Sequence, residues 1–326
     1  MSVSITNIRS AEVNEWDTIW QNCTYATFFH SREWAEIWEV YKKGKMKPDP
    51  KLFEFSDGLK ALLPLSRQTS FLGLTNSYFS SPAGTFGGWI SLDNLKMDHA
   101  RLLVSYMVGL GHLTWRLNPY NDLACNSGAP ITREDETHTL NLSHGFDDIF
   151  RKMTKGHRSA VRKAIRSGVE IKIATTLEDW KYYYQVYQDS LQRWGDRASS
   201  HYGWEMFHEM HRRHSPNIKL WLATHSDQIV AGALCFYSLK QAIYWHGAGF
   251  EEFFNMRPVN LIICEAIKEA CKQGYSWFDF NPSGPKEGVK NFKKSFGAQP
   301  SQCGIVQSSS KIHDFFKIIS PALRKK

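Results

Sequence analysis

Residues 218–249, IKLWLATHSDQIVAGALCFYSLKQAIYWHGAG, carry the pattern that decides the fold. Three apolar segments follow one another here, separated only by short polar breaks at 226–228 and 240–241. Connections this short join antiparallel neighbours, because a parallel crossover needs a dozen or more residues. The stretch therefore predicts a three-stranded antiparallel meander.

Helical segments flank the meander on both sides. Residues 157–167 and 177–195 place apolar side chains at helical spacing, and the strand-like VEIKIAT (169–175) separates them. The clearest helix is 259–273, with a proline near its start and a glycine after its end, and it leads into the strand YSWFDF (275–280). This order predicts an α/β domain with a mixed, mainly antiparallel sheet.

The first half of the chain shows a similar order of predicted helices and strands. It suggests helices around 13–20 and 34–41 and a hairpin at 51–65 with an Asp-Gly turn. Two segments correspond in detail: GHLTWRLNPY (111–120) and GYSWFDFNPS (274–283) both follow a helix, read Gly, six residues and Asn-Pro, and lie 163 residues apart. An internal duplication explains this match better than chance does.

The length of the chain agrees with a duplication. It has 326 residues, whereas a single hydrophobic core stops growing at about 250–300 residues. We therefore predict a first domain at 1–144, a second domain at 145–300 and a tail at 301–326. The basic, amphipathic end of that tail, 311–326, either packs back on the first domain or lies on an anionic membrane surface.

Positive charge is concentrated in the second half. The formal net charge is +8, to which residues 1–140 contribute −2 and residues 141–326 contribute +10. This asymmetry predicts contact with phosphates, whether of RNA, of a nucleotide-linked substrate or of a membrane surface. A basic solvated face is the alternative.

One basic stripe stands out within that half. Arg151, Lys155, Arg158, Arg162 and Arg166 follow one another at spacings of three or four residues, which places them on one side of a helix. Acidic partners at helical spacing are almost absent, so the usual pairing of charges does not explain the stripe. We predict that Arg158 and Arg162 bind phosphate groups of a substrate, with an ordinary solvated helix face as the alternative.

Several kinds of site and location are disfavoured. MSVSITNIRS does not have the pattern of a signal peptide, and no apolar run is long enough to span a bilayer. The six cysteines lack disulfide or zinc spacing, and the histidines of HEMHRRH (208–214) lack companion ligands, so we expect free thiols and no metal. Neither G-x-S-x-G nor a Walker A sequence is present. We expect a cytoplasmic protein, with contact at the inner membrane surface left open.

Five segments taken in order resemble the FemAB family. They are FFHSREWAEIW (28–38), HRSAVRKAIRSGVEI (157–171), YWHGAG (244–249), WFDFNPS (277–283) and NFKKSFG (291–297). The resemblance implies two tandem GNAT-like domains, each a mixed sheet flanked by helices. FemAB proteins transfer an amino acid from aminoacyl-tRNA to an amine of a peptidoglycan precursor, and looser relatives transfer acyl groups in other envelope pathways.

The resemblance therefore implies an N-acyltransferase that acts on an amine of a cell-envelope or surface-glycan precursor. We expect no bound cofactor and no DNA partner, and the acyl donor is either aminoacyl-tRNA or acyl-CoA. Two alternatives stay open: an acyl-CoA-dependent GNAT N-acetyltransferase, and a non-catalytic RNA- or nucleotide-binding module.

Two departures from the family pattern bear on the substrates. GNAT enzymes that use acyl-CoA hold its pyrophosphate on a glycine-rich turn, but the corresponding residues here, 255–260, contain no glycine. This favours a donor other than CoA, or CoA held differently. FemAB proteins often carry a lysine one turn after the Trp of the opening segment, and Trp38 occupies that place here, which puts a peptidoglycan precursor in doubt.

Three residues are candidates for the chemistry. The family carries a Phe-Lys pair that matches Phe292 and Lys293, and there the lysine lies at the reacting acyl group. We expect Phe292 and Phe296 to anchor the segment and Lys293 to enter the cleft, although a basic loop would also explain the lysine. His246 and Asp279 lie on successive strands and are candidate bases, with a sheet histidine and a turn cap as their alternatives.

Substrate-binding candidates complete the predicted site. They are Arg158, Arg162, Phe292, Arg257 and Ser283.

Overall fold

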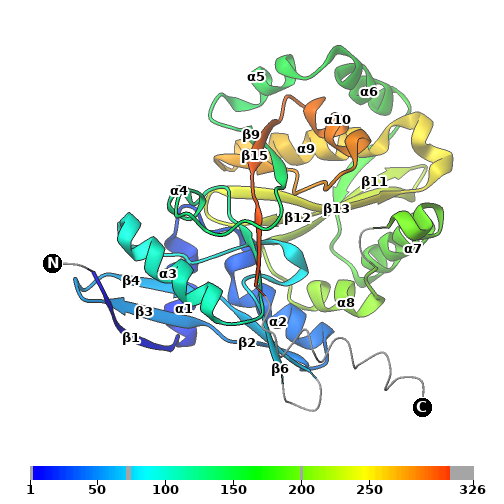
Figure 1. The fold of residues 1–326 in the computed structure, drawn as a ribbon. Helices are drawn as coiled ribbons and strands as arrows, with labels where there is room; N and C mark the ends of the chain where they lie inside the picture. Colours follow the sequence, from blue (N-terminus) through cyan, green and yellow to red (C-terminus); the bar gives the residue numbers. More distant parts are fainter. Residues whose placement is uncertain (1–2, 71–74, 199–200, 309–326) are drawn as a thin grey trace. The chain divides into compact units, whose positions relative to one another are not determined.

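The chain folds into two compact units. The computed structural model describes residues 3–70, 75–198 and 201–308 (Figure 1). The second unit is Glu136–Ser301, and the first is Met1–Asp135 together with the segment that begins at Gln302. The second unit thus begins earlier than the predicted residue 145.

The second unit is built on a seven-stranded mixed sheet in the order β10-β11-β12-β13-β14-β9-β15. The strands are β9 (Glu136–Asn141), β10 (Glu170–Ile173), β11 (Ile218–His225), β12 (Gln228–Tyr237), β13 (Gln241–Gly249), β14 (Trp277–Asp279) and β15 (Gln299–Gln302). β11, β12 and β13 form the predicted antiparallel meander, and β14 lies parallel to β13. β9 pairs with β14, which is why this unit begins at Glu136.

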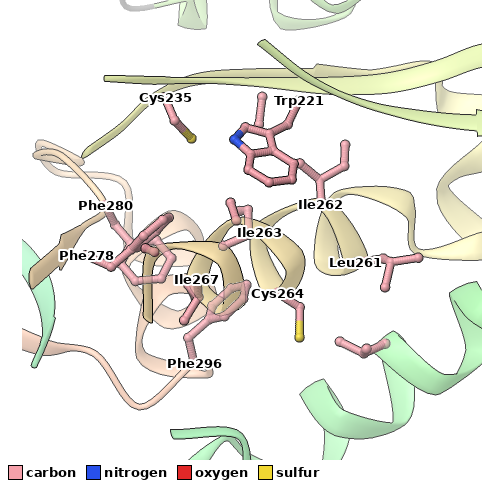
Figure 2. Packing of buried hydrophobic residues seen from close by; sticks show 14 of the residues in the cluster. Trp221, Cys235, Leu261, Ile262, Ile263, Cys264, Ile267, Phe278, Phe280 and Phe296 are labelled. Atoms are coloured by element: carbon pink, nitrogen blue, oxygen red, sulfur yellow. The ribbon is translucent and has the colours of Figure 1, made fainter. Parts of the chain in front are cut away.

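Helices cover both faces of this sheet (Figure 1). They are α5 (Gly145–Lys152), α6 (Lys155–Arg166), α7 (Leu177–Trp194), α8 (Trp204–Arg212), α9 (Pro258–Lys272) and α10 (Glu287–Lys294). α9 contacts the three meander strands, α5 and α6, whereas α7 contacts β12, β13 and α8. Figure 2 shows Trp221 and Cys235 of the sheet facing Ile262 and Ile263 of α9, so the main core lies under α9.

The sequence explains why α9 forms where it does. Pro258 occupies its first position, where a missing N–H breaks no helical hydrogen bond. Gly274 follows its end with a φ of +78°, a conformation that glycine adopts without strain. The buried face consists of Pro258, Leu261, Ile262, Ile263, Cys264, Ala266, Ile267 and Ala270. Burial of each large aliphatic side chain contributes about 1.5–3 kcal/mol, so packing holds this helix in place.

The first unit contains two smaller sheets and four α-helices among its described residues. The helices are α1 (Val13–Asn22), α2 (Arg32–Tyr41), α3 (Met97–Gly109) and α4 (Asp122–Cys125). The strands are β1 (Ile5–Ser10), β2 (Met46–Pro48), β3 (Lys51–Phe55), β4 (Lys60–Leu63), β5 (Ser66–Ser70), β6 (Thr75–Phe79), β7 (Phe86–Gly87), β8 (Leu113–Leu117) and β16 (Ile305–Ser308). β1, β3 and β4 form one sheet, and β16-β8-β6-β5-β2 form the other, with β7 beside β8.

Both copies keep the same late strand. β8 follows Gly111 and pairs in parallel with β6, and β14 follows Gly274 and pairs in parallel with β13. The predicted hairpin at 51–65 is also present as β3 and β4. Residues 311–326, for which we predicted docking or membrane contact, lie outside the described residues. No helix in the described ranges is long and apolar enough to cross a membrane.

Candidate active site

β13 and β14 part at a defined point in the second unit. Their parallel pairing joins 241–243 to 277–279, after which β14 ends and β13 continues to Gly249. β13 also has an irregular register with β12, in which Trp245 has no partner residue. A Cβ at Gly247 would lie 2.1 Å from the Tyr244 hydroxyl, so a larger residue there would push the tyrosine aside. The predicted candidates His246 and Asp279 both lie close to this point in the sequence.

Asp279 fixes the turn after β14. Its side chain is fully buried, and Oδ1 accepts hydrogen bonds from the Thr137 hydroxyl at 2.5 Å and from the Asn281 N–H at 2.6 Å. Asn281 has a φ of +59°, which a non-glycine residue adopts only when its surroundings hold it there. Asp279 therefore has the turn-capping role that we gave as its alternative.

Lys293 reaches the same turn from α10. It is only 3% exposed, and its ammonium donates to the Asn281 carbonyl oxygen. Our expectation of a side chain free to enter a cleft was wrong, because that carbonyl holds the ammonium within the packed unit. Burial, together with the charge of Lys293, lowers the pKa of His138 on β9. Asp279 thus accepts from the N–H of Asn281 and Lys293 donates to its carbonyl oxygen, so the two side chains meet at the same residue.

His246 lies in an aromatic cluster. Its Nδ1 is 2.6 Å from the Tyr183 hydroxyl, and its ring packs edge-on to Tyr187 with the centroids 4.5 Å apart. Burial lowers the pKa of His246 to about 3, so the ring is neutral and only weakly basic near pH 7. The described contacts of His246 are with Tyr183, Tyr187, Tyr202, Phe207 and Trp245, all outside the turn after β14 that Asp279 caps.

A pocket of about 810 Å³ opens at the start of α9. It is lined by Thr154, Gly156, His157, Ser159, Ala160, Lys163, Phe254, Arg257, Pro258, Val259, Asn260, Phe292 and Ser295. These residues come from α6 and its N-cap, from the beginning of α9 and the residues just before it, and from α10 with its C-cap. Two of the predicted binding residues, Arg257 and Phe292, therefore lie in one pocket.

The electrostatics of this pocket favour an anion. α6 and α9 both begin at it, and helix N-termini carry partial positive charge and unsatisfied N–H groups. No side chain in the described chain caps α9. Arg257, immediately before α9, has a left-handed φ of +62°, which costs an arginine about 1–2 kcal/mol. Lys163 adds a further cation to the lining.

His157 joins the three helices that line the pocket. It is 4% exposed, and its Nδ1 lies 3.1 Å from both Asn260 Nδ2 of α9 and the Ser295 Oγ that follows α10. Its ring lies 3.8 Å from that of Phe296, centroid to centroid. Burial lowers the pKa of His157 to about 4, and Nε2 has no hydrogen-bond partner among the described residues.

The basic stripe is divided between two helices. Arg151 lies on α5, and Thr154 caps the separate helix α6 by accepting from the His157 N–H. The Arg158 guanidinium donates to the carbonyl oxygens of Arg151 and Met153, so it closes the end of α5. Neither Arg158 nor Arg162 lines the pocket.

The remaining predictions concern Ser283 and the histidines of HEMHRRH. Ser283 lies in the turn after β14, outside the pocket lining, and its Oγ is buried without a partner in the described structure. The HEMHRRH histidines belong to α8 and the residues after it. Within the described residues, no group of three or more His, Cys, Asp or Glu side chains could hold a metal ion.

Sequence reasoning missed His157, Lys163 and Asn260. The first two stand inside HRSAVRKAIRSGVEI, but the helical periodicity directed attention to the arginines. His157 and Asn260 lie in the first turns of α6 and α9, and Lys163 lies farther along α6, so finding them would have required knowing that α6 packs on α9.

Comparisons with known proteins agree with this geometry. Residues 151–294 match the family model described as an acetyltransferase (GNAT) domain. The second unit carries a GNAT domain. Its matched range begins in α5 and ends with α10, and so includes the pocket, Lys293 and Asp279.

Solved structures extend the likeness to the whole chain. FemX is 12% identical with a TM-score of 0.71, and the match covers 96% of this chain and 100% of FemX. L-PGS from Bacillus licheniformis is 11% identical with a TM-score of 0.57, covering 93% of each chain. The C-terminal domain of a putative lysylphosphatidylglycerol synthetase from Agrobacterium fabrum is 10% identical with a TM-score of 0.53, covering 79% of this chain and 85% of that one. At these identities the likeness shows the fold alone.

A comparison with curated proteins found no significant match. The GNAT match and the FemX fold nevertheless confirm two predictions: the FemAB-like resemblance, and the fold class of tandem GNAT-like domains with mixed sheets flanked by helices. The chain is an acyltransferase whose GNAT domain is the second unit.

Proposed function

We propose that the protein transfers an aminoacyl or acyl group from a phosphate-bearing donor to an amine of a cell-envelope or surface-glycan precursor. The observation that carries this proposal is the pocket at the first turns of α6 and α9, inside the GNAT domain. FemX, L-PGS and the putative lysylphosphatidylglycerol synthetase share the fold and support an envelope substrate.

The lining of the pocket supports a phosphate-bearing donor. Aminoacyl-tRNA and acyl-CoA both carry phosphates, and a phosphate oxygen suits the N-terminal N–H groups of α9 and the ammonium of Lys163. Phe254 and Phe292 on the same lining offer apolar surface to the rest of the donor. Pro258 removes one N–H from the first turn, so side chains contribute more than in a glycine-rich cradle.

The proposed reaction is direct attack by the acceptor amine. The neutral amine nitrogen forms a bond to the acyl carbon and negative charge develops on the carbonyl oxygen. The bond to the donor oxygen or sulfur then breaks, the nitrogen gives up a proton, and the departing oxygen or sulfur takes up a proton from solvent. A fixed cation near that oxygen stabilises the transition state more than the ground state. Lys293 is our candidate for that cation on the family resemblance, although its ammonium donates to the Asn281 carbonyl oxygen and it does not line the pocket.

Labelled donors test the proposal. The purified chain is incubated with aminoacyl-tRNA or with acyl-CoA, each labelled in the acyl group, and with a panel of amines. We expect amine-dependent loss of label from one donor, and Lys163→Gln should raise the KM for that donor, whereas the exposed neighbour Arg162→Gln should change it less. Tight RNA binding without turnover of either donor would favour the non-catalytic module.

A second candidate is an acyl-CoA-dependent N-acetyltransferase. The position of the pocket at the start of α9 favours it, because a pyrophosphate would fit there. The absence of glycine at 255–260 argues against it. Turnover with acyl-CoA and none with aminoacyl-tRNA would select this candidate.

A further inference from the structure

A second hollow, of about 280 Å³, lies in the first unit. Its lining is Gly44, Lys45, Lys47, Arg67 and Thr69. Since a few tens of cubic ångströms already admit a water molecule, this hollow has room for a polyatomic ion. Its side chains supply three cations and one hydroxyl, and none of the described residues that line it is acidic.

Strand register gathers three of these side chains on one face. β2 and β5 are antiparallel neighbours, and Lys47 stands directly opposite Arg67. Side chains two residues apart on a strand point the same way, so Thr69 joins Arg67. Lys45 precedes β2 and belongs with Gly44 to the turn between α2 and β2, so the sheet places Lys47, Arg67 and Thr69 and the turn adds Lys45.

The positive charges of this cluster are poorly balanced by acidic side chains. Like charges directly opposite each other on neighbouring strands are destabilising. The nearest acid, Asp49, lies 3.9 Å from Arg67 and is already bound to Lys51 at 2.7 Å. Lys45 and Lys47 form no ion pair with any described residue. An anion in the hollow would remove the repulsion among all three cations.

Protection of an exposed sheet edge is the competing explanation. Lysines on edge strands prevent other chains from adding to a sheet, and β2 is an edge strand in the described sheet. That role explains Lys45 and Lys47. It does not explain Arg67, because β5 lies between β2 and β6 and has no open edge.

We propose that this hollow binds a phosphate group, as a phosphate monoester or diester. Arg67 offers a forked guanidinium that matches two phosphate oxygens, Lys45 and Lys47 add point charges, and the Thr69 hydroxyl adds a donor. The site belongs to the first unit, lies outside the matched GNAT range and does not depend on the proposed acyl transfer.

Pyrophosphate titration of the full chain tests this site. To reduce the contribution of the pocket in the second unit, all proteins carry Lys163→Gln. We expect Lys47→Gln with Arg67→Gln to weaken calorimetric binding by about tenfold or more, because two charged contacts are lost. The matched control, Lys42→Gln with Lys43→Gln, removes the same charge from the adjacent turn but no lining residue. It should change binding by less than about twofold.

Sedimentation with vesicles then distinguishes the sources of the phosphate. Loss of phosphatidylglycerol vesicle binding in the lining variant, but not in the control, indicates a lipid headgroup. Selective loss of pyrophosphate binding without any vesicle binding indicates a soluble phosphate. Equal loss in both double variants would assign the effect to diffuse surface charge and overturn the proposal. Lys47→Arg should retain binding, which separates lost charge from lost folding.

Discussion

Replacing Lys293 by Met tests whether a buried ammonium at the end of β14 supports the fold, the chemistry or both. The side chain is 3% exposed and donates to the Asn281 carbonyl oxygen. Met keeps a similar apolar stem but has no donor. Hydrogen bonds of charged groups contribute about 1.5–3 kcal/mol, and removal of the ammonium also relieves its desolvation. We expect the free energy of unfolding to fall by about 1–3 kcal/mol.

Turnover should fall by more than this loss of stability explains. A well-placed donor beside the developing oxyanion contributes about 3–4 kcal/mol to transition-state stabilisation. Folded Lys293→Met should therefore turn over its donor about a hundredfold more slowly, or worse. Urea denaturation followed by tryptophan fluorescence measures the stability, and release of labelled acyl groups measures the turnover, at a temperature where the variant is fully folded.

Lys294→Met is the matched control, because Lys294 lies next to Lys293 on α10 but is exposed. Near-normal turnover of folded Lys293→Met, or an equal loss in Lys294→Met, would refute the catalytic role. An unchanged free energy of unfolding would refute the structural role that we derive from the bond to Asn281.

Three further predictions follow from the GNAT domain. Arg158→Ala with Arg162→Ala, which removes two arginines outside the pocket lining, should leave the salt dependence of donor binding in fluorescence anisotropy unchanged, and a flattened slope would show that these arginines contact donor phosphates. Acetyl-CoA should bind weakly or not at all in calorimetry, because 255–260 lacks glycine, and saturable micromolar binding would contradict this. The pKa of His157 is lowered to about 4, so the unfolded chain takes up its proton first as pH falls. The free energy of unfolding should therefore drop between about pH 6.5 and 4, by up to about 1.4 kcal/mol per pH unit for this residue. In urea denaturation, the free energy of unfolding of His157→Asn should fall less steeply with pH than that of the unsubstituted chain, whereas the exposed control His208→Asn should show the original slope. Equal slopes for all three proteins would contradict the role given to His157.

Local patterns predicted most of the elements. The spacing of apolar residues in 259–273 and its flanking proline and glycine located α9 to within one residue at each end. The short breaks at 226–228 and 240–241 predicted the meander, because so few residues allow only hairpins. The place of β9 was missed. Its residues precede the predicted boundary, and only pairing with β14, distant in sequence, assigns them to the second unit.

The site was predicted less well, because burial and partners depend on packing. Arg257 and Phe292 were named as binding residues, and both line the pocket. Lys293 was expected to be free, but whether a helical lysine meets solvent or a carbonyl depends on what α10 packs against. Helical spacing likewise joined Arg151 to Arg158, whereas the Thr154 cap begins a new helix between them.

The diverged repeat explains why acyl-transfer chemistry belongs to the second copy. Alignment of GHLTWRLNPY with GYSWFDFNPS places Arg116 where Asp279 stands. Arg116 is buried and binds Asp135 at 2.8 Å and the Gly84 carbonyl oxygen at 2.6 Å. Breaking a buried ion pair of this kind costs free energy, because it leaves an uncompensated charge in the interior. In the first copy, therefore, this position stabilises the fold. The second copy instead sets a carboxylate and Lys293 around the backbone of Asn281, within the matched GNAT range. One position near the end of the same strand thus supports an internal ion pair in one copy and the candidate catalytic turn in the other.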